Sequence, residues 1–197
     1  KDVPAETQNK FLRHSLNDTE RLERLVENVL EATRLEQKEP HYEMKPIALA
    51  PLIDEGLRRI RRYAEDETVD LSADLDRDVL IQGDAHSLVS VFDNLIENAV
   101  KYSAAPKKIS VRLAADARHA VFEIQDNGMG IAEQDIPFIF ERFYRAGNEM
   151  TRSAKGTGLG LYVVKKIVEN HRGNISVHSD SAQNGTKFIV QFPLPKR

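Results

Sequence analysis

The 197-residue sequence contains no cysteine, so it can form neither a disulfide framework nor a metal site built on thiolates. It has no excess of basic residues, because 28 Lys and Arg stand against 31 Asp and Glu, for a formal net charge of −3. No basic surplus can therefore neutralise phosphates, which argues against nucleic acid as the main partner. No apolar run approaches the roughly 18 residues of a membrane span, and no signal-peptide pattern is present.

The composition is that of a soluble globular chain, with 41% hydrophobic and 30% charged residues, enough to bury a sizeable core. The absence of cysteine suits a cytosolic location. The chain begins with Lys1 and not with methionine, so we expect it to be a piece of a longer protein.

Residues 5–37 are predicted to form one long helix, because apolar side chains recur there at intervals of three and four. The stripe consists of Leu12, Leu16, Thr19, Leu22, Val26, Val29 and Thr33, flanked by Leu25 and Leu30. Charges of both signs cover the other faces, as on a bundle helix that dimerises, although the helix could instead pack back onto its own domain. The polar segment 38–46, with two prolines, divides the chain into a partial dimerisation helix, 1–40, and a second domain, 41–197.

Beyond this linker, strands and helices are predicted to alternate. We expect a strand around Ile47, a helix opened by Pro51, a strand over 69–75, a helix over about 85–102 capped by Gly83-Asp84, strands over 108–114 and 120–126, helices over about 133–144 and 158–170, and a closing hairpin of 174–179 and 186–192. This mixture predicts an α+β fold, an α/β sandwich in which helices cover one face of a mixed sheet.

The segment NLIENAVKYS, residues 94–103, ends the 85–102 helix with polar residues at helical spacing. The apolar face of that helix is formed by Leu88, Phe92, Leu95 and Ala99. Asn94, Asn98 and Lys101 share a different face, at the edge of the buried surface. They are either solvated residues of an amphipathic helix or a metal–phosphate site, since an amide oxygen can bind Mg²⁺ and lysine suits phosphate.

Two glycine-containing segments follow. DNGMGI, residues 126–131, comes directly after a predicted strand. It is either a simple turn or a backbone that approaches a flat ligand closely, with Asp126 accepting a hydrogen bond from an exocyclic amine. KGTGLGL, residues 155–161, opens a helix and offers backbone N–H groups to phosphates. It is not a dinucleotide fingerprint, because Leu161 stands where the third glycine belongs, and no P-loop motif occurs anywhere in the chain.

The loop between these segments, residues 142–155, is basic. It holds Arg142, Arg145, Arg152 and Lys155 against the single acidic Glu149. Such a loop either stays exposed to solvent or closes over a polyphosphate.

In this order and on these elements, the segments resemble the catalytic, ATP-binding part of bacterial sensor histidine kinases, which act in two-component signal transduction. NLIENAVKYS looks like the family's N box, DNGMGI its first glycine box, IFERFYR (139–145) its phenylalanine box and KGTGLGL its second glycine box. The resemblance spans about 45 to 195 and implies the histidine kinase/gyrase-type ATP-binding fold. RLERLVENVLEATRLEQ resembles the second helix of the family's dimerisation hairpin.

The resemblance implies ATP and Mg²⁺ as cofactors. It makes Asn98 the ligand of the Mg²⁺ that bridges the ATP phosphates, Asp126 the acceptor for the adenine amine and Arg145 the group that holds the γ-phosphate. Asn94, Asn98 and Arg145 form the implied catalytic set. The implied ATP contacts are Asn94, Asn98, Lys101, Tyr102, Asp126, Gly128, Gly130, Ile131, Arg142, Arg145, Gly156, Thr157, Gly158, Leu159, Gly160 and Leu161.

The family's phosphoacceptor box, which resembles S-H-E-L-R-T-P, is absent from this chain. His14 is the only histidine on the long helix, but that helix leads into the linker and is the wrong one, so we interpret His14 as a surface residue. His171 follows the 158–170 helix, at a helix C-terminus that favours a cation. The implied function is transfer of the ATP γ-phosphate to a histidine outside this fragment, and thence to a response-regulator aspartate.

The implied partners are a response regulator and a second copy of the chain in the full-length protein. The resemblance also implies that only upstream segments reach a membrane and that the present part lies in the cytoplasm. Two alternatives remain. A gyrase-like ATPase would need a glutamate base four residues before the metal asparagine, where this chain has Asn94, which cannot take a proton. A non-catalytic module that dimerises or docks a regulator is the other.

Overall fold

The computed structural model describes residues 7–8, 11–12, 19, 22, 26, 29–35, 41–63, 69–146, 157–179 and 185–195. Its main element is a five-stranded sheet in the order β2-β4-β5-β7-β6. These strands are β2 (Val69–Leu75), β4 (Lys107–Ala115), β5 (His119–Asp126), β7 (Thr186–Pro193) and β6 (Asn174–Ser179). β2 pairs with β4 in parallel, and every other pair in this sheet is antiparallel.

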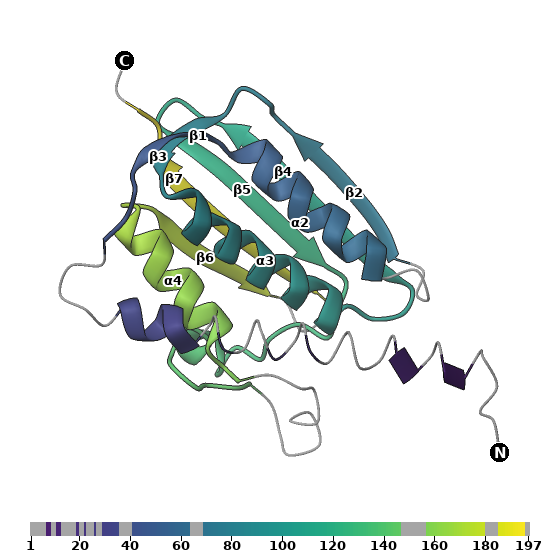
Figure 1. Cartoon of the computed structure of the whole chain (residues 1–197). Helices are drawn as coiled ribbons and strands as arrows, with labels where there is room; N and C mark the ends of the chain where they lie inside the picture. The colour runs from purple at the N-terminus through teal and green to yellow at the C-terminus, as the bar shows by residue number, and fades with distance from the viewer. Residues whose placement is uncertain are drawn as a thin grey trace.

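Three helices cover one face of this sheet (Figure 1): α2 (Leu49–Tyr63), α3 (Ala85–Tyr102) and α4 (Gly160–Asn170). The predicted α+β sandwich with a mixed sheet is therefore confirmed. A second sheet of two antiparallel strands, β1 (Lys45–Ala48) and β3 (Leu80–Gly83), pairs Ile47 with Ile81. The strand β1 was predicted and β3 was not, because LIQG is too short to show a strand periodicity before the helix begins.

The core lies between the helices and the sheet. Alternate residues of the strands face it, as a period of two requires: Ile109, Val111 and Leu113 on β4, Ala120, Phe122 and Ile124 on β5, and Phe188, Val190 and Phe192 on β7. The rings of Phe92 on α3 and Phe122 lie 5.0 Å apart at an angle of 64°. Each such fully buried side chain stabilises the fold by about 1.5–3 kcal/mol, which holds α3 firmly on the sheet.

α3 begins at the predicted place. Asp84 is its N-cap, with φ −100°, and its Oδ1 accepts a hydrogen bond from the backbone N–H of Ser87 at 2.9 Å. Such a cap satisfies a backbone donor that the first helical turn cannot. α2 begins at Leu49, two residues before Pro51, and the proline is tolerated because it lies in the first turn, whose N–H groups have no partner within the helix.

The helix predicted over 133–144 is wrong. The structure has a single 3-10 turn there, η2 (Ile136–Phe138), followed by further turns. Pro137 lacks the N–H that a helix interior needs, and Phe143 has a φ of 62°, outside the helical region. Local hydrogen bonds of the 3-10 type, such as Glu141 N–H to the Phe138 carbonyl at 2.8 Å, replace the helical ladder.

The described residues within 5–37 are helical, in agreement with the predicted long helix. Ala32 and Leu35 are buried in the hydrophobic core, so the end of this helix packs on the domain that follows. The apolar stripe further back is exposed: Leu12, Leu22, Val26 and Val29 are 65, 62, 58 and 47% exposed. Among the described residues of this helix, packing onto its own domain therefore covers the last turns and leaves those four side chains exposed. No helix in the described part of the chain is long and apolar enough to span a bilayer.

Candidate functional site

The predicted polar stripe lies on the C-terminal half of α3. Asn94 is half-buried, and its Nδ2 donates hydrogen bonds to the carbonyl oxygen of Ser90 at 2.8 Å and to its Oγ at 3.3 Å. Its Oδ1 faces the start of α4, because a Cβ added at Gly160 would lie only 2.5 Å from that oxygen. Asn98 is half-buried one turn further along α3. The Asn94 amide therefore lies beside the N-terminus of α4, and Asn98 follows it on the same helix.

Lys101 and Tyr102 end α3 and are both exposed. Lys101 Nζ donates a hydrogen bond to Tyr102 Oη at 3.0 Å and lies 4.6 Å from the centre of the same ring. Such cation–π contacts and a cation in the last helical turn are both favourable. Ser103 closes the helix, with its N–H and Oγ both donating to the carbonyl of Ala99. These two implied ATP contacts thus belong to one surface.

Asp126 ends β5 and is only 7% exposed. Its Oδ1 accepts hydrogen bonds from the backbone N–H groups of Gly128 at 2.7 Å and Thr186 at 3.2 Å. Burial raises the pKa of Asp126 above its ordinary value, and these two hydrogen bonds only partly oppose the effect. Among the described residues, both hydrogen bonds to this carboxylate go to Oδ1, which leaves Oδ2 as the oxygen for an external donor.

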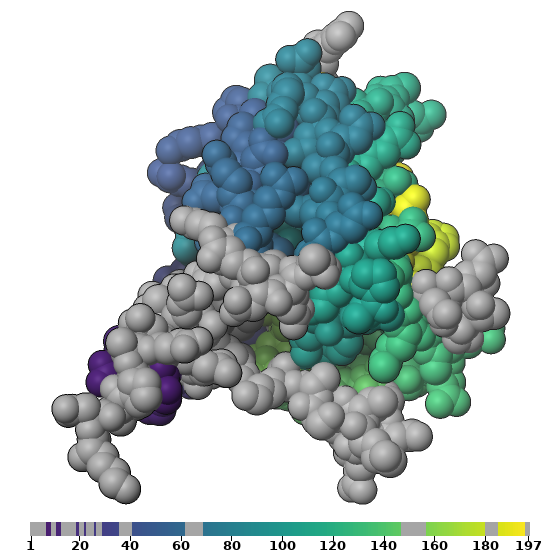
Figure 2. All heavy atoms as spheres, turned by 90° about the vertical axis from the view of Figure 1, so that its right-hand side faces the viewer, coloured from purple at the N-terminus to yellow at the C-terminus, as the bar shows by residue number. Residues whose placement is uncertain are grey.

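The first glycine box is packed against the end of α3. A Cβ added at Gly128 would lie 2.1 Å from the carbonyl oxygen of Tyr102, so only glycine fits there. The side chain of Asn127 holds the loop in place: its Oδ1 accepts from Lys108 N–H and its Nδ2 donates to the Pro106 carbonyl, both at 2.9 Å. In Figure 2, the end of α3 and the green segment that carries this loop lie next to one another on the same face. The segment is therefore more than a simple surface turn.

The phenylalanine box and the second glycine box meet. The described part of the second box comprises Thr157, Gly158, Leu159, Gly160 and Leu161, and Gly156 lies outside the described residues. Gly158 has a φ of 73°, its carbonyl accepts the N–H of Phe143 at 3.0 Å, and an added Cβ would lie 2.7 Å from the Phe143 carbonyl carbon. Here the left-handed backbone and the close contact both require glycine.

The basic loop is described only at its first residues. Arg142 is exposed, and its guanidinium carbon lies 4.9 Å from the centre of the exposed Phe143 ring. Arg145 is half-buried. The remaining predicted cations, Arg152 and Lys155, lie outside the described residues. The part of the loop that the structure describes therefore carries two arginines on either side of the contact between Phe143 and Gly158.

Two residues of this region were missed by the sequence analysis. Thr186 supplies a backbone N–H to Asp126, and Ser179 joins the first glycine box to the β6–β7 hairpin. Ser179 Oγ accepts the N–H of Ile131 at 2.7 Å and donates to the carbonyl of Gly185 at 3.0 Å. Gly130 supplies the positive φ, 72°, that turns the loop toward Ser179. A strand-end serine and threonine carry no local signal for such roles.

His171 is buried, with 2% exposure, so the expectation of a cation at this helix end is wrong. Its Nδ1 donates to the carbonyl of Ile167 at 2.8 Å, and its Nε2 accepts the N–H of Asp84 at 3.0 Å. Burial lowers the pKa of His171, and a ring nitrogen that accepts a hydrogen bond carries no proton. The neutral imidazole is a structural link between α3 and α4.

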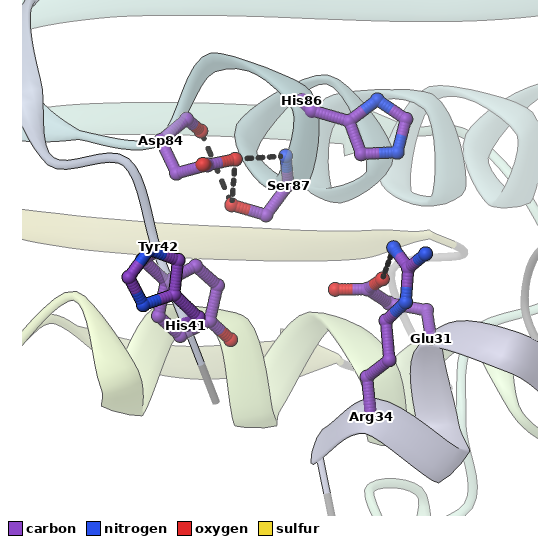
Figure 3. A pocket seen from close by; sticks show the side chains of 7 residues that line it. All are labelled: Glu31, Arg34, His41, Tyr42, Asp84, His86 and Ser87. Atoms are coloured by element: carbon purple, nitrogen blue, oxygen red, sulfur yellow. Dashed lines mark hydrogen bonds and ion pairs between the residues drawn. The ribbon is translucent and has the colours of Figure 1, made fainter. Parts of the chain in front are cut away.

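A polar pocket of about 340 Å³ lies at the other end of α3, away from the predicted nucleotide residues. Figure 3 shows Glu31 and Arg34, from the helical segment 29–35, facing the start of α3. The pocket is lined by Glu31, Arg34, His41, Tyr42, Asp84, His86 and Ser87. Although Asp84 is partly buried, hydrogen bonds from Ser87 and Glu43 lower its pKa. The long helix, the linker and the start of α3 together line this cavity.

The described residues contain no cluster of three His, Asp or Glu side chains that could hold a metal ion. A divalent cation in the candidate site would therefore depend on an asparagine amide oxygen together with oxygens from a bound ligand. That donor set fits Mg²⁺, which is commonly held by few protein ligands plus substrate phosphates.

Comparison with known proteins identifies the family. Residues 83–196 match the family described as histidine kinase-, DNA gyrase B-, and HSP90-like ATPase. The sensor histidine kinase RppB of Synechocystis sp. is 33% identical over 175 residues, which are 88% of this chain and 38% of that protein. The chain thus spans well under half the length of this relative.

Solved structures agree. The mycobacterial sensor histidine kinase MprB matches with a TM-score of 0.68 and 31% identity, covering 77% of this chain and 100% of that one. The histidine kinase ThkA, solved in complex with the response regulator protein TrrA, matches with a TM-score of 0.73 and 25% identity, covering 100% of this chain and 55% of that one. The resemblance inferred from the four boxes is confirmed: the chain belongs to the histidine kinase-, DNA gyrase B- and HSP90-like ATPase family, and its fold is that of the ATP-binding catalytic domain of sensor histidine kinases.

Proposed function

We propose that this chain binds Mg·ATP and serves as the catalytic part of a two-component sensor histidine kinase. In the whole protein it transfers the γ-phosphate of ATP to a histidine outside this chain, and a response-regulator aspartate receives the phosphoryl group next. The observation that carries the proposal is the buried Asp126, which is held through Oδ1, has Oδ2 left for a donor and belongs to a loop packed against the end of α3.

At the base end, Asp126 accepts the hydrogen bond of the adenine amine. Its carboxylate is already oriented by the Gly128 and Thr186 N–H groups, so little ordering is required when the nucleotide binds. Gly128 and Gly130 let the backbone approach the flat base. Tyr102, with Ile131, lies on the sugar and base side.

At the phosphate end, Asn98 would hold the metal, and the Asn94 amide oxygen lies against Gly160 at the start of α4. A Mg²⁺ ion held there would supply positive charge to the phosphate oxygens. Lys101 and Arg142 approach the phosphates as cations. The backbone of Thr157 to Leu161 offers N–H groups at the α4 N-terminus, a favourable place for anions.

Arg145 holds the γ-phosphate from the basic loop 142–155, and Gly156, Gly158 and Gly160 serve as the hinge of that loop. In the transfer itself the bond from the γ-phosphorus to the bridging oxygen breaks, ADP leaves with the electron pair, and a bond to an imidazole nitrogen forms. Positioning and charge stabilisation supply most of the catalysis in phosphoryl transfer.

A gyrase-like ATPase is the weaker alternative. Such an enzyme needs a general base beside the metal site to activate water. Asn94 occupies that position, and an amide cannot take a proton. The Asn94 Nδ2 also donates hydrogen bonds to Ser90, which fix the orientation of the amide. ATP bound here without a histidine in reach should therefore turn over very slowly.

We also propose a response regulator and a second copy of this chain as partners. ThkA was solved with a response regulator, which supports a response regulator as the partner here. The exposed apolar stripe of the long helix fits a homodimeric four-helix bundle in the full-length protein. We place this part in the cytoplasm, attached to a membrane only through upstream segments, and assign residues 1–40 to dimerisation and 41–197 to catalysis.

Incubation with γ-labelled ATP tests the proposal. The present chain should bind ATP without labelling itself, whereas a longer chain that includes the upstream hairpin helix should acquire an acid-labile label, as a phosphoramidate is. Release of free phosphate by either chain would indicate an ATPase, and no reaction by the longer chain would indicate a non-catalytic module. Strong labelling of the present chain that His14→Ala abolishes would make His14 the acceptor.

A further inference from the structure

We propose that Ser179 is a positioning residue for base recognition. Its hydroxyl joins the first glycine box to the hairpin that orients Asp126, and it thereby sets the preference for adenine over guanine. The proposal rests on the function proposed above, in which Asp126 binds the amine of adenine.

The Ser179 hydroxyl bridges two segments that are far apart in the sequence. At the end of β6, its Oγ accepts the N–H of Ile131 at 2.7 Å and donates to the carbonyl of Gly185 at 3.0 Å. A third contact, at 3.5 Å, joins it to Oγ1 of Thr186. A serine hydroxyl has one proton and two lone pairs. Because the proton goes to Gly185, Thr186 must donate in the third contact, and the hydroxyl uses its full capacity.

The two segments that Ser179 joins are the two that hold Asp126. Oδ1 of this carboxylate is bound from one side by Gly128, within the first glycine box, and from the other by Thr186, at the start of β7. Gly185 adds direct contact, since a Cβ placed there would lie 2.3 Å from the Asp126 carbonyl oxygen. Ser179 therefore fixes the spacing of the two N–H donors that aim the carboxylate.

Removing the hydroxyl should loosen this arrangement without unfolding the sheet. In Ser179→Ala the Ile131 N–H loses its partner and the glycine box can shift relative to the hairpin. The backbone pairing of β6 with β7, from Asn174 to Ser179, does not depend on the side chain. We expect the affinity for ATP to fall about 5- to 30-fold, the equivalent of one or two lost hydrogen bonds, and the preference for ATP over GTP to narrow.

Calorimetric titration of the full chain with ATP, GTP and inorganic tripolyphosphate, each with Mg²⁺, tests the proposal. Ser179→Ala should weaken ATP binding and leave tripolyphosphate binding unchanged, because the phosphate end does not touch Ser179. Ser179→Thr retains the hydroxyl and should restore ATP affinity and preference. The matched control is Ser176→Ala, on the same strand but on its other face, which should behave as the parent.

Hydrogen exchange in the presence of ATP supplies the second measurement. The Ile131 amide should exchange faster in Ser179→Ala than in the parent, with the β6–β7 amides still protected. An unchanged ratio of ATP to GTP affinity, or equal losses for ATP and tripolyphosphate, would overturn the role of Ser179. A parent chain that binds tripolyphosphate but does not prefer ATP would instead refute the proposed function of Asp126.

Discussion

The backbone N–H of Asp84 donates a hydrogen bond to Nε2 of His171, a residue 87 positions later, at 3.0 Å. The other ring nitrogen donates to the Ile167 carbonyl, and the ring packs edge-on against Tyr42 with centres 5.1 Å apart. One buried imidazole thus joins the N-cap of α3, the end of α4 and the linker. Because α3 carries the predicted phosphate-binding amides, this link helps to hold the candidate site together.

The first prediction concerns pH. Burial lowers the pKa of His171 in the folded chain, so below about pH 6.5 the unfolded chain binds more protons at this residue than the folded one. The neutral His171 therefore contributes fully to the free energy of unfolding above about pH 6.5. This contribution is lost as the pH falls from there through the lowered pKa of the folded chain. Urea unfolding should give a lower free energy of unfolding at pH 5.5 than at pH 7.5.

The variant His171→Leu should lower the free energy of unfolding by about 1–3 kcal/mol at pH 7.5, because the Asp84 N–H loses its partner. It should also show a smaller drop between the two pH values. His86→Gln, at an exposed histidine, is the control and should retain the pH dependence of the parent. A drop of equal size in the parent and in His171→Leu would contradict the prediction.

The second prediction concerns the end of α4. Arg172 has a φ of 59°, its N–H donates to the Glu169 carbonyl and the Gly173 N–H donates to the Val168 carbonyl. These bonds form a Schellman motif, whose left-handed position favours glycine. Arg172→Gly should raise the free energy of unfolding by about 1 kcal/mol.

Urea unfolding measures this change as well. Arg118→Gly, at an exposed arginine without a positive φ, is the matched control and should not stabilise the chain. If Arg172→Gly were no more stable than the parent, the positive φ of Arg172 would not lower the free energy of unfolding.

The third prediction concerns Asp126→Asn. The amide oxygen can still accept the Gly128 and Thr186 N–H groups, but an NH₂ group replaces the oxygen proposed to face the adenine amine. ATP affinity should fall about 10- to 100-fold, and GTP should gain relative to ATP because its carbonyl accepts from the new donor. Competition of each nucleotide against a fluorescent ATP analogue would measure both changes.

The same substitution removes a buried charge whose pKa burial has raised. The nucleotide-free variant should therefore be more stable than the parent near neutral pH, a common trade-off at binding sites. Unchanged preference between ATP and GTP would show that Asp126 is only a turn residue.

The fourth prediction concerns the metal. Asn98→Ala should weaken Mg·ATP binding by about 1.5–3 kcal/mol, or roughly 10- to 100-fold, if its amide oxygen is a metal ligand. Binding of ATP without Mg²⁺ should change little. Asn174→Ala, at an exposed asparagine of β6, is the control, and calorimetry with and without Mg²⁺ is the measurement. Equal Mg·ATP affinities for Asn98→Ala and the parent would remove Asn98 from the metal site.

Features that depend on neighbouring residues could be predicted from the sequence. The apolar face of α3 repeats every three or four residues, and β4, β5 and β7 alternate every two, so their buried sides follow from local order. The Asp84 cap and the glycines at 128 and 158 also carry local signals. The helix expected over 133–144 failed although apolar residues are frequent there, because Pro137 and the left-handed Phe143 favour a chain of turns.

The amino-acid sequence by itself therefore determined the elements apart from β3 and the segment 133–144, together with their buried faces and the four boxes of the candidate site. Only the tertiary structure decided that Ser179 meets Ile131 and that Thr186 meets Asp126, residues 48 and 60 positions apart, and that His171 is neutral. The physical reason is that the periodicity of a helix or strand depends only on residues close together in the sequence. The partner of a distant N–H group depends on the path of the whole chain, and only burial by that path shifts a pKa.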